Sequence, residues 1–419
     1  MAHSAPPQTE QPGTEGLLSV AQARERVLQR IQPLSPIALP LQETYGCTLA
    51  EDMFAEGDLP PFSSSAMDGF AIRSADVADA GSGGVELRVV GRALIGHRPE
   101  GTVGNGEAIR IATGAPIPAG ADAIVPIEQV VADEDHVRVM EPVPAGRHIR
   151  PVGEDVKEGS VLVRAGRRIG APEMGLLASA GHSQVLANPR PRVIVLSTGD
   201  ELVEPGREPR YGQIPDSNAY TLFGALREAG AVPYLAGIVR DDVDQLRDTI
   251  FNHLVQADAF ISSGGVSMGD RDVVKAAFFR RGDLDFFRVA MQPGMPQAFG
   301  LIEGKPYWGL PGNPVSVFAS FEVFIRPALM KMMNRRELFR PEITAKLTAD
   351  VSGPRGKTQF ARVLVRRTPE GRVAEPTGGS ASNLISTIAR ANGLAIVPPG
   401  VETLRAGADC RVMLFRSPE

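Results

Sequence analysis

The sequence predicts a multi-domain α/β plus β protein, in which one doubly wound α/β domain is joined to domains built mainly of β-strands. Three observations predict this class. Strand-like and helix-like segments alternate between residues 190 and 334, which is typical of a parallel sheet covered by helices. Short β-branched runs broken by Gly and Pro fill residues 58–145 and return after Asn334. A chain of 419 residues also exceeds one hydrophobic core and predicts about two to four domains.

The elements can be predicted in chain order. Residues 1–16 are polar and rich in Pro, Gln and Gly, which is typical of a disordered tail. Residues 17–33 have apolar side chains at helical spacing and end at a proline, so they predict an amphipathic helix. Residues 146–185 contain turns and one helical stretch, APEMGLLASAG. In the α/β region, RVIVLS, VPYLAGIV and DAFISS predict strands, QAFGLIEGKPYWGL predicts a strand pair, and Pro314 begins a long apolar helix.

Composition excludes several classes of function. Aromatic residues make up 5% of the chain and its net charge is −5, which argues against a nucleic-acid binder. Cys47 and Cys410 cannot build a disulfide framework, and no His or Cys spacing indicates zinc. No apolar run is long enough to span a membrane and no signal peptide is evident. We therefore expect a cytoplasmic protein that does not insert into the membrane.

Three loops of the α/β region follow predicted strands, at the edge where open α/β sheets bind ligands. Ser197–Glu201 ends in a Gly and two carboxylates, which suit a site for Mg²⁺ and phosphate. Ser262–Asp270 is dense in Gly and Ser, whose backbone N–H groups can approach an anion. Leu310–Pro314 opens a helix whose free N–H groups form an anion site. The alternative for each loop is structural: a helix cap, a tight turn or a plain helix start.

Three further clusters lie outside that region, and each is weak alone. They are Pro60–Phe70, which contains Asp68; Ile111–Pro116, which contains Thr113; and Gly153–Asp155. No dinucleotide fingerprint and no P-loop is present to explain the phosphate-type loops.

Taken together, the six clusters resemble the MoeA family of molybdopterin molybdenumtransferases, which includes the E domain of gephyrin. The resemblance covers roughly residues 17–419. Related single-domain proteins share the SSGG and PGNP loops but lack the MDG and TGAP segments, which this chain has. The motifs that carry the resemblance are PPFSSSAMDGFAIR, RIATGAPIPAGADAIVPIE, IRPVGEDV, VLSTGDELVEPG, GQIPDSN, GIVRDD, SSGGVSMGDRDVVK and GLPGNPVS.

The resemblance implies a homodimer with four domains in each chain. Residues 17–57 and 146–185 would form a composite domain, residues 58–145 an inserted β domain, residues 186–334 the molybdopterin-binding α/β domain, and residues 335–419 a β-barrel-like domain. The active site would lie between the α/β domain of one subunit and the MDG-bearing region of the other.

The resemblance also implies a reaction and a set of site residues. Molybdopterin-AMP would be hydrolysed with the help of Mg²⁺, molybdenum from molybdate would be placed on the dithiolene, and AMP would be released. Asp200 and Glu201 would hold the metal. The catalytic positions that match the family are Asp68, Asp155, Glu201, Asp241 and Asp272. The substrate-binding positions are Thr113, Ser262, Gly264, Gly265, Arg288, Pro311, Pro314, Arg362 and Ser382.

One segment departs from the family. Where the family often carries lysines in a pattern like KxxxKPGKP, this chain has Arg288, Gln292 and Met295. A pocket for molybdate or phosphate would lose up to two positive charges, unless a nearby basic group replaces them. This departure motivates an alternative function, a gephyrin-like scaffold that binds a peptide or protein partner through the C-terminal domain and the dimer interface.

Overall fold

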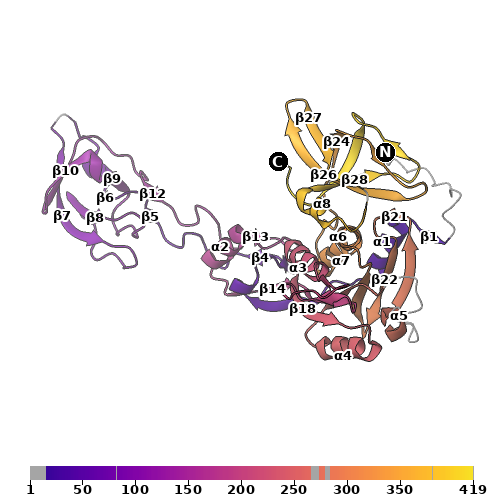
Figure 1. Cartoon of the computed structure of the whole chain (residues 1–419). Helices are drawn as coiled ribbons and strands as arrows, with labels where there is room; N and C mark the ends of the chain where they lie inside the picture. Colours follow the sequence, from indigo (N-terminus) through magenta and orange to yellow (C-terminus); the bar gives the residue numbers. More distant parts are fainter. Residues whose placement is uncertain (1–15, 82, 266–272, 279–283, 380, 419) are drawn as a thin grey trace, which may run out of the picture. The chain divides into compact units, whose positions relative to one another are not determined.

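The computed structural model describes residues 16–81, 83–265, 273–278, 284–379 and 381–418 (Figure 1). The chain divides into two compact units. Unit 1 comprises Met1–Ile37, Gly46–Thr48 and Ala187–Glu419, and unit 2 comprises Ala38–Tyr45 and Leu49–Leu186. The predicted tail lies outside the described residues except for Gly16. The chain passes between the units in β2 (Ile37–Pro40), β3 (Thr48–Leu49) and β14 (Gln184–Asn188).

A seven-stranded sheet forms the centre of unit 1, in the order β1-β20-β22-β23-β19-β15-β18. The strands β18, β15, β19 and β23 are parallel neighbours, whereas β22 is antiparallel to β20 and to β23. The predicted strand pair is therefore β22 and β23. The bounds are β1 (Leu17–Leu18), β15 (Arg192–Thr198), β18 (Val232–Val239), β19 (Ala259–Ser263), β20 (Leu284–Val289), β22 (Pro296–Ile302) and β23 (Lys305–Leu310).

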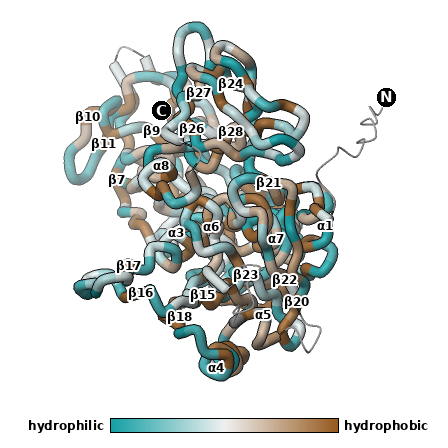
Figure 2. The backbone as a smooth tube through the Cα atoms, turned by 45° about the vertical axis from the view of Figure 1, so that its right-hand side comes forward, coloured by the Kyte–Doolittle hydropathy of each residue, from teal (hydrophilic) through white to brown (hydrophobic). Residues whose placement is uncertain are grey.

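Helices cover both faces of this sheet, which confirms the predicted doubly wound fold. Val193 and Val195 of β15 pack with α1, α3, α6 and α7, whereas Ile194 and Leu196 pack with α4 and α5. Successive strand residues point to opposite faces, so an unbroken apolar strand is buried on both sides. In α4, apolar and polar stretches alternate along the turns (Figure 2). The bounds are α1 (Val20–Gln29), α3 (Asn218–Ala229), α4 (Val243–His253), α5 (Val273–Phe278), α6 (Pro314–Ser320) and α7 (Arg326–Met332).

Two helices of unit 1 differ from their predicted form. The first begins at Val20 rather than at residue 17, because Leu17 and Leu18 pair with β20. Ser19 caps it, accepting from the Gln22 backbone while the Gln22 side chain accepts from the Ser19 backbone. The long apolar helix contains a π-helical segment, η5 (Phe321–Ile325), between α6 and α7. None of the helices in the described ranges is long and apolar enough to cross a membrane.

The C-terminal part of unit 1 is a closed five-stranded barrel, as predicted for this region. Its strands follow the order β26-β27-β24-β30-β28, and β26 pairs with β28 to close the ring. The strand β21 (Met291–Gln292) extends the barrel by pairing with β26. The other bounds of this part are β24 (Glu342–Leu347), β26 (Thr358–Thr368), β27 (Gly371–Pro376), α8 (Ile385–Arg390), β28 (Gly393–Val397) and β30 (Asp409–Leu414). Two separate strand pairs complete unit 1: β16 (Leu202–Val203) with β17 (Ile214–Pro215), between β15 and α3, and β25 (Val351–Ser352) with β29 (Thr403–Leu404).

Unit 2 contains a six-stranded sheet in the order β10-β11-β7-β8-β6-β9, so the predicted all-β character of its central part is confirmed. Phe70, Ile72 and Val125 belong to one of its apolar cores. The bounds are β4 (Met53–Phe54), β5 (Ser64–Ser65), β6 (Gly69–Ile72), β7 (Val85–Ala93), β8 (Glu107–Ile111), β9 (Ala123–Pro126), β10 (Val130–Ala132), β11 (His136–Val139), β12 (Ile149–Arg150), β13 (Val161–Val163) and α2 (Ala171–Ser179), with short 3-10 turns at Leu41–Glu43, Ser74–Val77 and Ile127–Gln129.

The strand order of unit 1 determines where a ligand can bind. The chain leaves β15 and builds β18 on one side of it, and then crosses to build β19 on the other side. The connections therefore diverge at the carboxyl ends of β15 and β19, and open α/β sheets bind ligands in the crevice at such a switch point. Two of the three loops singled out from the sequence begin there, at Thr198 and Ser263.

Candidate functional site

The loop after β15 brings carboxylates to the switch point. Asp200 and Glu201 are exposed just beyond the strand, and Asp241 follows the neighbouring β18. Burial raises the pKa of the Asp241 carboxyl above its ordinary value, and the charges of Asp200 and Glu201 raise it further. A Cβ atom at Gly199 would lie 2.5 Å from Glu201 Oε2. Glycine at this position therefore leaves room for the Glu201 carboxylate beside the backbone.

The loop after β19 is held against both neighbouring strands. The backbone N–H of Gly264 donates to the carbonyl of Leu310 at 2.9 Å. Below the loop, Ser262 is fully buried and its hydroxyl accepts from the Tyr307 hydroxyl at 2.7 Å. The hydroxyls of Ser197 and Ser263 lie 3.0 Å apart. These buried hydroxyls fix the strand ends, so in this state Ser262 supports the loop while Gly264 and Gly265 form its surface.

Glycine is required at both positions of this loop. Gly264 and Gly265 have φ of +89° and +68°, a region that residues with a Cβ rarely adopt. A Cβ at Gly264 would lie 2.6 Å from the Thr198 carbonyl oxygen, and one at Gly265 would lie 2.8 Å from Val274 Cγ2. The Gly264 N–H is already bonded to Leu310, so the backbone of Gly265 is the part of this turn that can approach a ligand without an intervening side chain.

We expect Gly264→Ala to lower the free energy of unfolding by about 3 kcal/mol, because it adds a backbone clash to an unfavourable φ. The matched control is Gly212→Ala, since Gly212 has φ of +88° and no atom within 4 Å of the added Cβ. The control should lose only about 1 kcal/mol. Urea unfolding of the two variants measures the difference, and equal losses would show that the close approach to Thr198 has no energetic consequence.

The third loop, Leu310–Pro314, joins β23 to α6. Pro314 occupies the first turn of α6, and Pro311 and Gly312 lie beside it on the loop. The Asn218 side chain of α3 donates to the Gly312 carbonyl at 2.7 Å. The loops after β19 and β23 are also linked, through the bond from Gly264 to Leu310. The structure therefore brings together the three loops that the sequence singled out.

Two predicted residues lie in the C-terminal part of unit 1. The Ser382 carbonyl accepts from the backbone N–H of Val315 at 3.1 Å, which ties its segment to the start of α6. Arg362 is 3% exposed, and its guanidinium donates to Thr387 Oγ1 and to the carbonyls of Gly379 and Ala381. Arg362 therefore holds the segment that leads to Ser382, and a direct contact of Arg362 with substrate stays a prediction.

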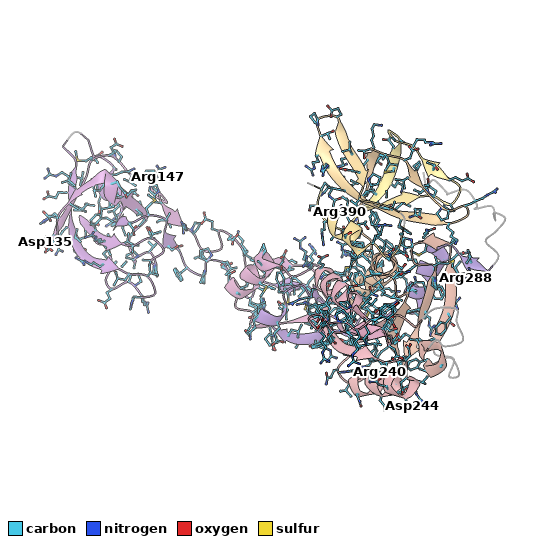
Figure 3. All side chains as sticks on the ribbon, in the orientation of Figure 1. Asp135, Arg147, Arg240, Asp244, Arg288 and Arg390 are labelled. Atoms are coloured by element: carbon cyan, nitrogen blue, oxygen red, sulfur yellow. The ribbon has the colours of Figure 1, made fainter. Side chains whose placement is uncertain are left out.

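Lys357, a basic residue that the sequence analysis did not single out, lies beside the segment at residues 288–295 that differs from the family pattern. Lys357 Nζ is 3.6 Å from Met295 Sδ, and Arg288 Nη2 is 3.5 Å from the same sulfur. Arg288 is exposed on β20 (Figure 3). The pairing of β21 with β26 brings this segment next to the strand that follows Lys357. A thioether is a weak acceptor, so both cations keep donors for an anion.

The predicted residues of unit 2 are described within that unit alone. Asp68 and Thr113 come from separate motifs, yet the Asp68 carboxylate accepts from the backbone N–H of Thr113 at 2.8 Å. Asp155 is exposed, and its backbone N–H donates to the Leu59 carbonyl. The MDG and TGAP segments therefore form one local arrangement. Asp272 lies outside the described residues.

The carboxylates near the switch point can be compared with the ligands that the expected Mg²⁺ requires. In the described ranges, no three Asp, Glu, His or Cys side chains are grouped closely enough to hold a metal ion by themselves. Mg²⁺ usually takes one or two protein carboxylates and completes its shell with water and substrate phosphates. The pair of Asp200 and Glu201 fits that mode of binding and does not fit a site made of protein ligands alone.

Comparisons with known proteins match three successive segments of the chain. Residues 18–181 match the family described as the MoeA N-terminal region (domain I and II), residues 194–331 a probable molybdopterin binding domain, and residues 344–415 the MoeA C-terminal region (domain IV). The chain is 40% identical over 401 residues to Molybdopterin molybdenumtransferase 2 of Mycobacterium tuberculosis (strain H37Rv), covering 94% of this chain and 98% of that protein. The chain belongs to the MoeA family.

Other relatives that match nearly the whole chain support the same family assignment. The Molybdopterin molybdenumtransferase of Haemophilus influenzae is 33% identical over 403 residues, covering 95% of this chain and 99% of that protein. The crystal structure of a MoeA molybdopterin biosynthesis protein from Pyrococcus horikoshii superposes with a TM-score of 0.77 at 31% identity, covering 96% of this chain and 100% of that one. The family and the fold expected from the motifs are thereby confirmed.

Proposed function

We propose that this chain is a molybdopterin molybdenumtransferase. It binds molybdopterin-AMP and molybdate, hydrolyses the phosphoanhydride, transfers molybdenum to the dithiolene and releases AMP. The observation that carries the proposal is the joining of three anion-type loops and the acidic pair at one edge of the sheet in unit 1. The names of the relatives that match nearly the whole chain support it.

The chain's own residues divide the work of binding and orientation. Gly264 and Gly265 let the backbone approach the phosphates, and the loop of Pro311 and Pro314 lies beside them at the start of α6, where the Val315 N–H is bonded to the Ser382 carbonyl. Asp200 and Glu201 would hold Mg²⁺ together with the phosphates. When bound, Mg²⁺ neutralises the charge that develops on phosphate oxygens during cleavage. Asp241 and Asp272 would orient the pterin or water.

The assembly is part of the same proposal. The active enzyme is a homodimer in the cytoplasm, with the composite, inserted β, α/β and barrel domains bounded as expected from the sequence. Asp68 and Thr113 would come from the partner subunit, and Asp155 would act as a further catalytic carboxylate. The hydrogen bond between Asp68 and Thr113 supports a shared role for the MDG and TGAP segments. The two cysteines, Cys47 and Cys410, are buried and do not form a disulfide, which suits a reducing compartment.

Rescue of molybdoenzyme activity, such as nitrate reduction, in a strain that lacks its own transferase tests the proposal. We expect the intact chain to restore the activity at ordinary molybdate concentration. Failure to rescue, with the protein present in soluble form, would reject it. A scaffold without transferase activity is less favoured, because Arg288 and Lys357 supply the cations whose loss at Gln292 and Met295 motivated that alternative.

We expect Lys357→Gln to weaken molybdate binding about tenfold, because a hydrogen bond from a charged donor contributes about 1.5–3 kcal/mol. Isothermal titration with molybdate measures the change. The matched control is Lys346→Gln, a lysine of the same part of the chain that pairs with Asp409 on an exposed surface. Met295→Lys in the Lys357→Gln background should restore affinity. Equal affinities of the two glutamine variants would show that Lys357 does not contact the oxyanion.

A further inference from the structure

The turn between β20 and β22 lies beside Arg288 and Lys357, the two cations that would face molybdate. Both cations contact the Met295 sulfur at the end of this turn. The backbone N–H of Val289 donates to the Met295 carbonyl at 2.8 Å, which closes residues 290–294 into a loop. The position of this turn therefore affects where the two cations can meet an anion.

A buried amide, that of Gln297, joins the turn to α6. Gln297 is 5% exposed, and its Nε2 atom donates to the Gly294 carbonyl and to Ser320 Oγ, both at 2.6 Å. Ser320 is the last residue of α6 and is fully buried. A Cβ atom at Gly294 would lie 2.7 Å from Ser320 Oγ, so the turn packs directly against the end of the helix. Both N–H groups of the Gln297 amide are therefore engaged in holding the turn rather than a ligand.

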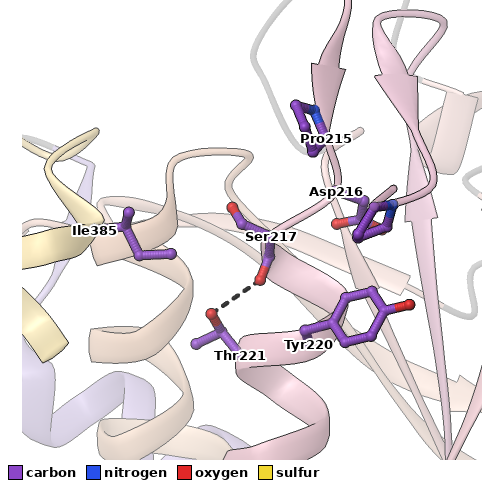
Figure 4. A pocket seen from close by; sticks show the side chains of 7 residues that line it. Pro215, Asp216, Ser217, Tyr220, Thr221 and Ile385 are labelled. Atoms are coloured by element: carbon purple, nitrogen blue, oxygen red, sulfur yellow. Dashed lines mark hydrogen bonds between the residues drawn. The ribbon is translucent and has the colours of Figure 1, made fainter. Parts of the chain in front are cut away.

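The opposite end of α6 meets the phosphate-type loops. Asn218 of α3 donates to the Gly312 carbonyl at 2.7 Å, just before α6 begins at Pro314. A hydrogen bond within the first turn of α3 braces this anchor (Figure 4). Pro314 and Ser320 are the two ends of α6, which places them about 9 Å apart along the helix axis. The helix therefore fixes the separation between the loop that precedes it and the turn packed on its last residue.

We infer that Gln297 is a positioning residue, which holds the turn on α6 so that molybdate bound by Arg288 and Lys357 lies at a fixed separation from the phosphate-type loops. The inference rests on the proposed function for the identity of the oxyanion. Without the amide, the Gly294 carbonyl loses its buried donor, and the turn is no longer tied to the helix. A displacement of about 1 Å is enough to impair a site built from oriented groups.

Titration of the full-length chain with molybdate and, separately, with AMP tests the inference. Gln297→Met keeps an unbranched side chain of similar size and removes both hydrogen bonds. We expect it to weaken molybdate binding about tenfold and to leave AMP binding on the phosphate-type loops unchanged. The matched control is Asn392→Leu, because Asn392 is a buried amide of the barrel that also makes two hydrogen bonds, with the backbone N–H and carbonyl of Val365. The control should lose stability and still bind molybdate as the parent chain does.

Ser320→Ala is a second, milder variant, and it carries the test if Gln297→Met does not fold. It removes only the hydroxyl that accepts from Gln297, so it should weaken molybdate binding in the same direction. Because the two side chains act through one hydrogen bond, the double variant should bind molybdate no more weakly than Gln297→Met alone. Parent-like molybdate affinity in both single variants would overturn the inference, as would equal losses of affinity in Gln297→Met and Asn392→Leu.

The outcome is separable from that of the proposed function, because oxyanion binding needs no turnover. A chain that fails to rescue molybdoenzyme activity, yet loses molybdate affinity in Gln297→Met, rejects the transferase and keeps the positioning role. In a chain that does rescue, the positioning role predicts a higher KM for molybdate and an unchanged KM for the adenylated substrate. An unchanged KM for molybdate in Gln297→Met would reject the positioning role and keep the transferase.

Discussion

Replacement of Glu201 by glutamine is expected to reduce molybdate-dependent cofactor formation about 100-fold while leaving the fold intact. The side chain lies at the carboxyl end of β15, beside Asp200 and close enough to Asp241 for its charge to raise the pKa of that group. Glutamine keeps the size and removes the charge. A preorganised group that stabilises developing charge typically contributes about 100-fold or more to the rate, and a neutral amide would also be a poor ligand for Mg²⁺.

The matched control for this prediction is Glu204→Gln, three residues further along the chain. Glu204 is also exposed, but its charge is not among the causes that raise the pKa of Asp241. The control should keep nearly full activity in a reconstitution assay with purified molybdopterin-AMP, molybdate and Mg²⁺. Thermal unfolding of both variants should match the parent chain. Full activity in Glu201→Gln would remove Glu201 from the site.

The fold was predictable where the signals are local. The run from Val193 to Leu196 predicts a strand buried on both faces, and these four residues do alternate between the two cores. The strand at Leu17 and Leu18 could not be predicted, because its partner β20 lies about 270 residues later and two residues carry no periodicity. The π-helical segment was also missed, since an extra residue in one turn leaves a fully apolar helix looking continuous.

The site was predictable to a similar extent. Glycine pairs and helix starts act through their own backbone, so the loops at Gly264 and Pro311 could be recognised from a few letters of sequence. The role of Lys357 could not, because it depends on segments that meet only when the chain folds. Lys357 lies beside Met295, which is 62 positions away in the sequence. Contacts between residues so far apart in the sequence cannot be predicted from a local sequence pattern.

The largest effect on stability is expected from Glu322→Ala in the π-helical segment. The Glu322 side chain is 1% exposed and forms two hydrogen bonds of 2.9 Å with the Arg340 guanidinium. Arg326 is a second, partly buried cation nearby: burial lowers its pKa, the charge of Arg340 lowers it further, and the charge of Glu322 raises it. The Glu322 carboxylate therefore compensates the positive charge of both Arg340 and Arg326. Removing it leaves buried positive charge uncompensated, which costs about 3–5 kcal/mol.

A matched exposed pair shows whether burial is the reason. Glu375 and Arg366 lie 2.7 Å apart with about half of each side chain exposed, and exposed pairs contribute about 0–1 kcal/mol. Urea unfolding should therefore give a loss several times larger for Glu322→Ala than for Glu375→Ala. Adding Arg340→Leu to Glu322→Ala removes one stranded charge and should recover part of the loss. If it recovers nothing, the cost comes from the cavity left in the π-helical turn rather than from the unpaired guanidinium.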